Sequence, residues 1–235
     1  MLNELKANFY FLYKDSGRSI LYFWSIYIGF ITAFLIITSI TDNVTLMLSM
    51  ALPAAIYTLI FGILFVKESF PYMIKYGSTR QGYFIAIAIF SAVFSLIMVT
   101  VNQIVSFLMN KIINYFQLTN VELQVFDDMF KEQYSTLQIA TFEFFMYFII
   151  FTMTIVLGAL YFRFGFLIGS VINATIVVLF ITVRPLRNFL HDAIAYVLIG
   201  NDNYTPIALI VPPLIMLILF GAILQRSSVL DQIKK

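Results

Sequence analysis

Apolar residues dominate this 235-residue chain in long runs, which short polar segments separate. A helix that crosses a bilayer needs about 20 predominantly apolar residues. The runs that reach this length lie at 20–40, 46–66, 83–108, 139–162, 164–183 and 206–224. The pattern therefore predicts an all-α integral membrane protein, a single domain over 1–235 with six transmembrane helices. The last run contains Pro206, Pro212 and Pro213, so we expect that helix to be kinked or broken.

Composition supports this class and excludes others. The chain is 61% hydrophobic and 11% charged, whereas soluble domains carry about 25% charged residues. It has no cysteine for a disulfide or a thiolate, and a single histidine argues against a self-contained zinc site. We therefore predict no catalytic residue, no metal site and, because the basic residues are spread between the apolar runs, no nucleic-acid partner.

The basic residues predict the orientation in the membrane. With the N-terminus in the cytoplasm and six crossings, ten of the 14 Lys and Arg residues lie inside. The four outside are Lys111, Lys131, Arg184 and Arg187. Both termini are thus predicted to be cytoplasmic, with 109–138 and 184–205 extracellular. The pattern of 109–138 fits helices on the outer surface and a simple extension of the flanking helices equally well, and 184–205 holds a short interfacial or re-entrant stretch.

The first 16 residues predict an amphipathic helix in the cytoplasmic interface, or else an ordinary juxtamembrane anchor. Their apolar positions recur at helical spacing, at Leu2, Leu5, Phe9 and Leu12. We expect Ser16-Gly17-Arg18 to end this helix and to turn the chain into the membrane.

The cytoplasmic segment 67–82 predicts a short surface helix from Pro71 to Tyr76. Pro71 suits a helix start and Gly77 a helix end, and Ser78 with Gln81 forms a capping-box pattern that begins the next helix. The alternative is a plain loop that obeys the positive-inside rule. No phosphate-binding Gly-x4-Gly-Lys-[Ser/Thr] motif occurs anywhere, so energy from ATP would have to come from a partner.

Residues 70–84, FPYMIKYGSTRQGYF, resemble the Phe-Pro-(apolar)…Gly-(Val/Ser)-(Ser/Thr)-Arg-x-x-(Tyr/Phe)-Phe stretch of bacterial ABC-transporter permeases of the type-2 exporter class. The layout is similar too, and Arg163-Phe164-Gly165 is similar to a Tyr-Arg-Phe-Gly turn of these permeases. Within the class, the chain looks most like permeases that export amphipathic peptide toxins. At the level of residues the resemblance covers about fifteen positions.

The resemblance implies how the chain would work. Two permease chains, identical or paralogous, would pair in the plasma membrane of a bacterium and move amphipathic or hydrophobic cargo outward. Separate cytoplasmic ABC ATPase subunits would bind ATP and Mg, and this chain would hold no cofactor. The coupling helix that contacts the ATPase would comprise Pro71, Tyr72, Met73, Lys75, Tyr76, Gly77 and Arg80.

Polar side chains inside membrane helices are costly and often functional. The candidates for a translocation path are Asn102, Gln103, Glu143 and Asn173. Hydrogen bonds between helices are the alternative for the three amides, and an ion pair with Lys111 or Lys131 for Glu143. Gly165 and Gly169 form a Gly-x-x-x-Gly pattern that suits a dimer interface or packing within one chain.

Two other classes of function compete with an ATP-driven exporter. A secondary transporter or channel without an ATPase needs paired broken helices and midplane charges, which the sequence does not clearly offer. An intramembrane serine protease would need Ser170 to reach His191, which lies beyond the end of its helix and is better interpreted as an interfacial residue.

Overall fold

The computed structural model describes residues 2–40, 46–118, 121–124, 135–185, 187–188, 209–225 and 227. These residues are predominantly helical, with one short pair of strands. The elements are α1 (Leu2–Ile40), β1 (Leu46–Ser49), α2 (Ala51–Lys75), α3 (Arg80–Tyr115), β2 (Val121–Gln124), α4 (Thr136–Thr182) and α6 (Val211–Gln225).

Four helices, α1 to α4, are long and apolar enough to cross a membrane, which is consistent with a multi-pass membrane protein. α4 covers two of the six predicted spans, 139–162 and 164–183. Gly165, with non-helical angles (φ 80°, ψ 166°), marks the kink between them. α6 has 15 residues and is shorter than a typical span. The count of six membrane crossings therefore stays a prediction.

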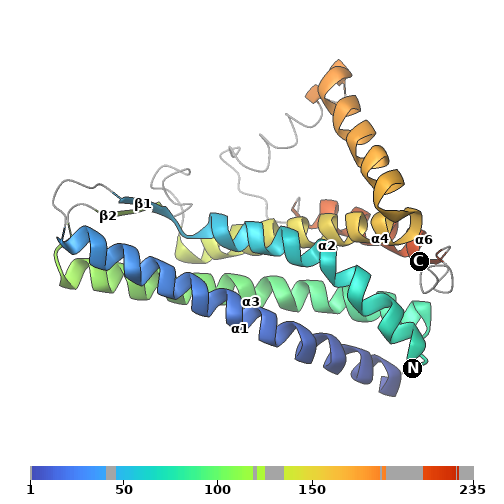
Figure 1. Cartoon of the computed structure of the whole chain (residues 1–235), viewed down its shortest axis with the longest axis horizontal. Coiled ribbons are helices and arrows are strands. Elements are labelled where there is room, and N and C mark those ends of the chain that lie inside the picture. Colours follow the sequence, from blue (N-terminus) through green and yellow to red (C-terminus); the bar gives the residue numbers. More distant parts are fainter. Residues whose placement is uncertain are drawn as a thin grey trace.

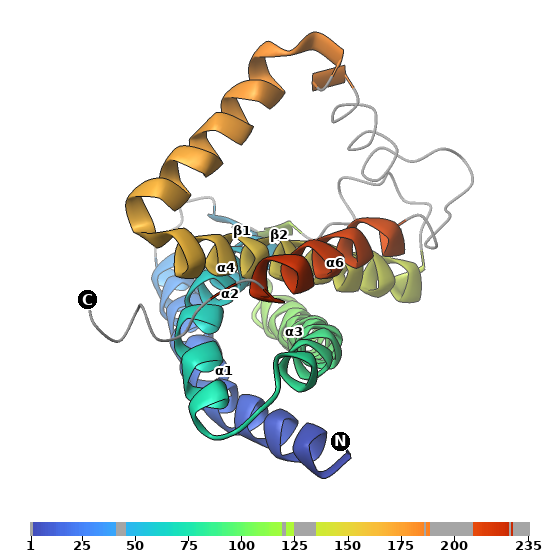
Figure 2. The same cartoon turned by 90° about the vertical axis from the view of Figure 1, so that its right-hand side faces the viewer.

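The helices form an elongated bundle. Figure 1 shows α1, α2, α3 and the first part of α4 running along the long axis of the molecule. α2 packs against α4, α3 lies between α1 and α4, and α6 lies along α4 (Figure 2). After Gly165 the rest of α4 leaves the bundle, and its apolar side chains are exposed, Phe166 and Leu167 by 76% and 80%.

Two boundaries differ from the sequence-based predictions. α1 is one continuous helix, so the predicted break at 16–18 is wrong: the Ser16 hydroxyl donates to the carbonyl of Leu12 at 2.6 Å, and Gly17 lies within the helix. The predicted helix at 46–66 begins only at Ala51, because 46–49 form β1.

β1 pairs in parallel with β2, with Leu46 opposite Val121. A four-residue strand inside an apolar run cannot be distinguished from helix by periodicity, so the sequence did not predict it. The pair joins the α1–α2 connection to the segment after α3, at the end of the bundle opposite the α2–α3 turn (Figure 1).

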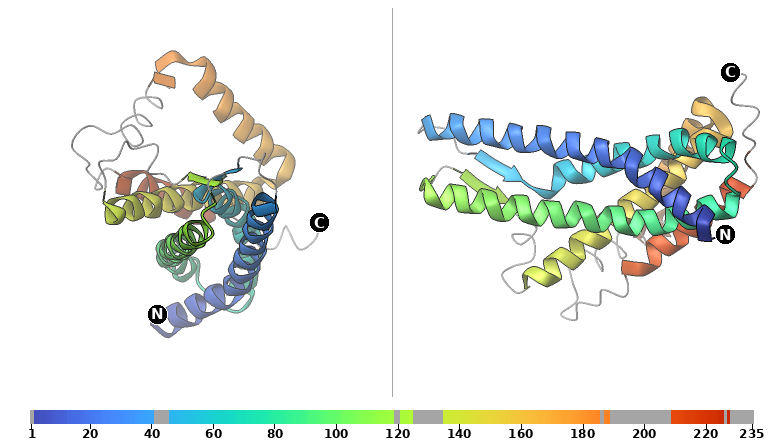
Figure 3. Two further views of the ribbon diagram at one scale, coloured as in Figure 1. Left: turned by 90° about the vertical axis from the view of Figure 1, so that its left-hand side faces the viewer. Right: turned by 90° about the horizontal axis from the view of Figure 1, so that it is seen from below.

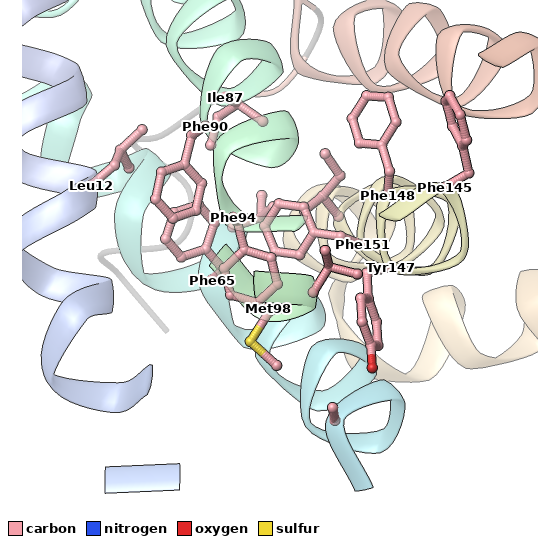
Figure 4. Close-up of a cluster of buried hydrophobic side chains, with 14 of the residues drawn as sticks. Leu12, Phe65, Ile87, Phe90, Phe94, Met98, Phe145, Tyr147, Phe148 and Phe151 are labelled. Carbon is pink, nitrogen blue, oxygen red and sulfur yellow. The ribbon is translucent and has the colours of Figure 1, made fainter. Parts of the chain in front are cut away.

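Aromatic rings from three helices fill the core. Phe94 of α3 stacks on Phe61 of α2 at 5.2 Å and on Phe151 of α4 at 4.7 Å, and Phe65 stacks on Phe90 at 4.9 Å. Figure 4 shows most of these side chains converging between the three helices. Within the aromatic-rich run of α4, core packing accounts for the buried side chains Phe142, Phe145, Tyr147, Phe148 and Phe151.

Candidate functional site

The turn between α2 and α3 is the part of the described chain where the predicted coupling residues lie. α2 runs through Pro71 and ends at Lys75, so the predicted separate helix from Pro71 to Tyr76 is wrong. Pro71 removes one backbone donor from the helix interior, and the last part of α2 points away from the axis of its first part (Figure 1).

A Schellman motif ends α2. Gly77 adopts the left-handed conformation with φ 87°, which only glycine adopts without strain. Its N–H donates to the carbonyl of Ile74 at 3.1 Å, and the N–H of Ser78 donates to the carbonyl of Met73 at 3.0 Å. The predicted role of Gly77 as a helix terminator is confirmed.

The predicted capping box of Ser78 and Gln81 is wrong by one residue. Thr79 is the N-cap of α3, and its hydroxyl accepts the N–H of Gly82 at 3.0 Å. In a capping box, the residue at Gly82 would be Glu or Gln, and its side chain would accept the N–H of Thr79. Glycine cannot do so, which leaves that donor for another group.

Glu4 of α1 supplies the missing acceptor. Its Oε1 accepts the backbone N–H of Thr79 at 2.7 Å and the Thr79 hydroxyl at 2.8 Å. These two hydrogen bonds lower the pKa of the Glu4 carboxyl, because they favour its charged form. A side chain added at Gly82 would collide with this carboxyl, so glycine at the third position of α3 makes room for it.

Further contacts tie the start of α1 to the turn (Figure 3). The Asn8 amide donates to the Ser78 hydroxyl at 2.7 Å, and Phe11 stacks on Tyr72 with ring centroids 4.7 Å apart. Phe9 contacts Phe90 of α3 edge to face. Part of the apolar stripe of the N-terminal segment, Phe9 and Leu12, therefore packs on protein, and the predicted position of this segment in the cytoplasmic interface stays a prediction.

The end of α6 meets the same turn. The Arg80 guanidinium donates to the backbone carbonyl of Gln225, at the C-terminal end of α6, where a cation also complements the helix dipole. Two segments far apart in sequence, the start of α1 and the end of α6, thus converge on the turn, at residues 78–80.

The exposed face of the turn is aromatic and basic. Tyr72 and Tyr76 are 45% and 71% exposed, their hydroxyls lie 3.3 Å apart, and Lys75 is exposed beside them. Met73 was predicted for this face, but it is 3% exposed and belongs to the core. Spacing along the chain could not predict Glu4, Asn8 or Gln225 as part of the site; the only local signal was the glycine at position 82.

The structure joins three of the four polar residues predicted for the spans. Asn102 donates to both carboxylate oxygens of Glu143, at 3.3 and 3.1 Å, and Gln103 donates to Oε2 at 3.1 Å. These are hydrogen bonds between α3 and α4, the predicted alternative to a translocation path. Asn173 lies elsewhere, with its amide 3.5 Å from the Tyr161 hydroxyl.

Gly165 and Gly169 have separate roles in the bend of α4. Gly165 provides the positive φ, and a Cβ at Gly169 would lie 2.5 Å from the ring of Tyr161 in the same chain. This packing uses the Gly169 face within the chain.

Among the described residues, no group of three or more His, Cys, Asp or Glu side chains could hold a metal ion, and His191 lies outside them.

The fold defines the class only broadly: its four long apolar helices are consistent with a multi-pass membrane protein. Comparison with known proteins adds no narrower class: no family model, curated protein or solved structure matches the chain.

Proposed function

We propose that this chain is the permease subunit of an ATP-driven ABC exporter, with the α2–α3 turn as its coupling site. One observation carries the proposal. The turn presents exposed Tyr72 and Tyr76, and hydrogen bonds of Glu4 and Arg80 fix it to α1 and α6. A force applied to a turn braced in this way would move the helices attached to it instead of deforming the turn.

Charge distribution supports a cytoplasmic location for this end. Lys6 lies in α1 between Glu4 and Asn8, which contact the turn, and Lys75 and Arg80 flank the turn itself. Such an excess is typical of the cytoplasmic side of bacterial membrane proteins. We therefore place the turn and the N-terminus in the cytoplasm, where ATPase subunits that bind ATP and Mg would dock.

The further elements of the proposal follow from the resemblance in residues 70–84. A second permease chain would complete the pathway, and the cargo would be amphipathic or hydrophobic, most simply a peptide or toxin. Charged side chains are rare in the apolar helices, which suits such cargo better than a small ion.

A secondary transporter or channel without an ATPase is the alternative, and buried Glu143 is the observation that favours it, since intramembrane carboxylates often mark ion pathways. Purification of the tagged chain from its own membrane separates the two hypotheses. We expect an ATPase to co-purify and to hydrolyse ATP in the complex.

Tyr76→Ala should abolish that association, because it removes the most exposed ring of the turn. Tyr115→Ala is the matched control, since Tyr115 is also an exposed tyrosine, by 82%, but lies at the other end of α3. An ATPase that binds both variants equally would contradict the location of the coupling site, and a wild-type preparation without any ATPase would contradict the exporter itself.

A further inference from the structure

Among the described residues, the carboxyl group of Glu143 has no positively charged partner and only two hydrogen-bonding side chains, Asn102 and Gln103. The residue is 1% exposed, in the part of α4 that packs against α3. Its hydrogen-bond donors are the neutral amides of Asn102 and Gln103, and no Lys or Arg among the described residues forms an ion pair with it. An ionised carboxylate buried without a counter-charge is very costly.

Asn102, which donates to this carboxyl, also lacks a hydrogen-bond donor for its own side-chain oxygen among the described residues. Both bonds of its amide nitrogen go to Glu143, while its oxygen Oδ1 is buried and accepts no hydrogen bond within the described part of the chain. Asn102 is also 1% exposed, so bulk water does not supply the missing donor. A buried acceptor without a donor costs about 1–3 kcal/mol in proteins generally.

In the part of the chain that the structure describes, the neighbouring helices contribute no compensating charge; Lys131, one of the two partners predicted for Glu143, lies outside that part. On α4, Tyr147 lies one turn after Glu143, and its hydroxyl is directed to the carbonyl of Ala51 in α2 at 3.5 Å. On α1, Tyr27 bonds instead to the carbonyl of Ser49 at 3.3 Å. α6 contains no ionisable side chain. Lys111 is eight residues beyond Gln103, about 12 Å farther along α3.

We infer that Glu143, Asn102 and Gln103 form a proton-binding site, which holds a proton in this arrangement of the helices. One added proton neutralises the carboxylate, which has no counter-charge among the described residues, and turns one of its oxygens into a hydrogen-bond donor. Oε1 is the position for it, since Oε1 accepts only the longer bond of 3.3 Å, whereas Oε2 accepts two bonds of 3.1 Å.

The amide of Asn102 can adapt to the proton. A half-turn about its terminal bond exchanges Oδ1 and Nδ2, so that Oδ1 accepts the hydrogen from Oε1 while Nδ2 gives up its two bonds to the carboxyl and takes the buried position that Oδ1 leaves. Gln103 continues to donate to Oε2. The site thus joins α3 to α4 through a neutral carboxyl group, and it differs from the turn in both location and chemistry.

Infrared spectroscopy of the full chain in lipid nanodiscs tests the inference. We expect a carbonyl stretch of a protonated carboxylic acid at neutral pH, which shifts in deuterated buffer and is lost in Glu143→Gln. Glu68→Gln, at an exposed position in α2, is the matched control and should keep the band. A wild-type protein without this band, or a Glu143→Gln variant that keeps it, would overturn the inference.

Two additions keep the test decisive. If Glu143→Gln does not fold, carboxyl-labelled glutamate in the wild-type chain should shift the band, which assigns it to a glutamate; a band that does not shift would overturn the inference. The second is thermal unfolding in sodium, potassium and choline chloride at equal ionic strength. Stabilisation of the wild type by sodium or potassium, absent in Glu143→Gln, would show that a metal ion occupies the site instead of a proton. Neither measurement involves an ATPase, so failure here leaves the proposed function untouched.

Discussion

Gly158 of α4 faces the main chain of α2, and one added methyl group measures how closely these two helices pack. A Cβ built at Gly158 lies 2.6 Å from the carbonyl oxygen of Ile63 and 3.3 Å from Cβ of Val66. The first of these atoms is backbone, so α2 itself would have to move. Small residues permit such close approaches between membrane helices, where packing rather than the hydrophobic effect drives association.

The size of the effect follows from two opposing terms. Replacing glycine by alanine inside a helix stabilises it by about 0.5–1 kcal/mol. Overpacking a tight interface costs about 1–3 kcal/mol. Gly17→Ala isolates the first term, because Gly17 lies within α1 and a Cβ there meets no atom within 4 Å. The difference in the free energy of unfolding between Gly158→Ala and Gly17→Ala therefore measures the steric overlap alone, and we expect about 1–3 kcal/mol.

Thermal unfolding in one detergent measures this difference. For a chain of this length, we expect the midpoint of Gly158→Ala to lie roughly 2–12 °C below that of Gly17→Ala. Ile63→Val would not relieve the overlap, because the contact is with the backbone. If the two alanine variants unfold at the same temperature, α2 and α4 are not in contact at Gly158, and the packing described for the bundle is wrong.

Three further predictions concern the turn and its surroundings. Gly77→Ala should lower the free energy of unfolding by about 1–2 kcal/mol, because alanine is strained at φ 87°; chemical denaturation measures the loss. The contact of Glu4 with Thr79 should be complete above the ordinary carboxyl pKa of about 4.3 and be lost as the pH falls through the lowered pKa of the folded protein. Hydrogen exchange of residues 76–82 should show this acid step in the wild type and not in Glu4→Gln. Tyr83→Phe removes the 2.8 Å hydrogen bond with Ser69 and should cost about 0.6–1 kcal/mol in thermal unfolding, with no effect if that bond is absent.

Periodicity predicted the apolar helices well because bilayer length and helical rise leave few alternatives. Local rules succeeded where the cause was local, as at Gly77, whose left-handed conformation strains most other residues. They failed at the start of α3, where Thr79 rather than Ser78 is the N-cap. Ser78 is instead bonded to Asn8, 70 residues away, so tertiary contact decided between two adjacent capping residues.

The polar residues of the spans illustrate the same limit. Their cost in an apolar helix identified Asn102, Gln103 and Glu143 as special, but no spacing rule relates α3 to α4. Asn173 carried the same signal and has a different partner. No sequence pattern distinguished Glu4 from other charged residues near the N-terminus. Its role as acceptor for the N–H of Thr79 follows only from the structure, where its carboxyl lies beside Gly82, the third residue of α3.

α3 connects the proposed coupling site to the proposed proton site. It runs without interruption from Arg80 past Asn102, about 33 Å along its axis, so a displacement of the turn should also displace the amides that hold Glu143. Separation of α3 from α4 would let water reach the carboxyl, which would then release its proton. Since the joined arrangement binds one proton more, acid favours it. We therefore expect partner-stimulated ATP hydrolysis to fall as the pH falls in the wild type and to lose this dependence in Glu143→Gln. An identical pH profile in the two proteins would show that the two sites are not coupled, even if each exists.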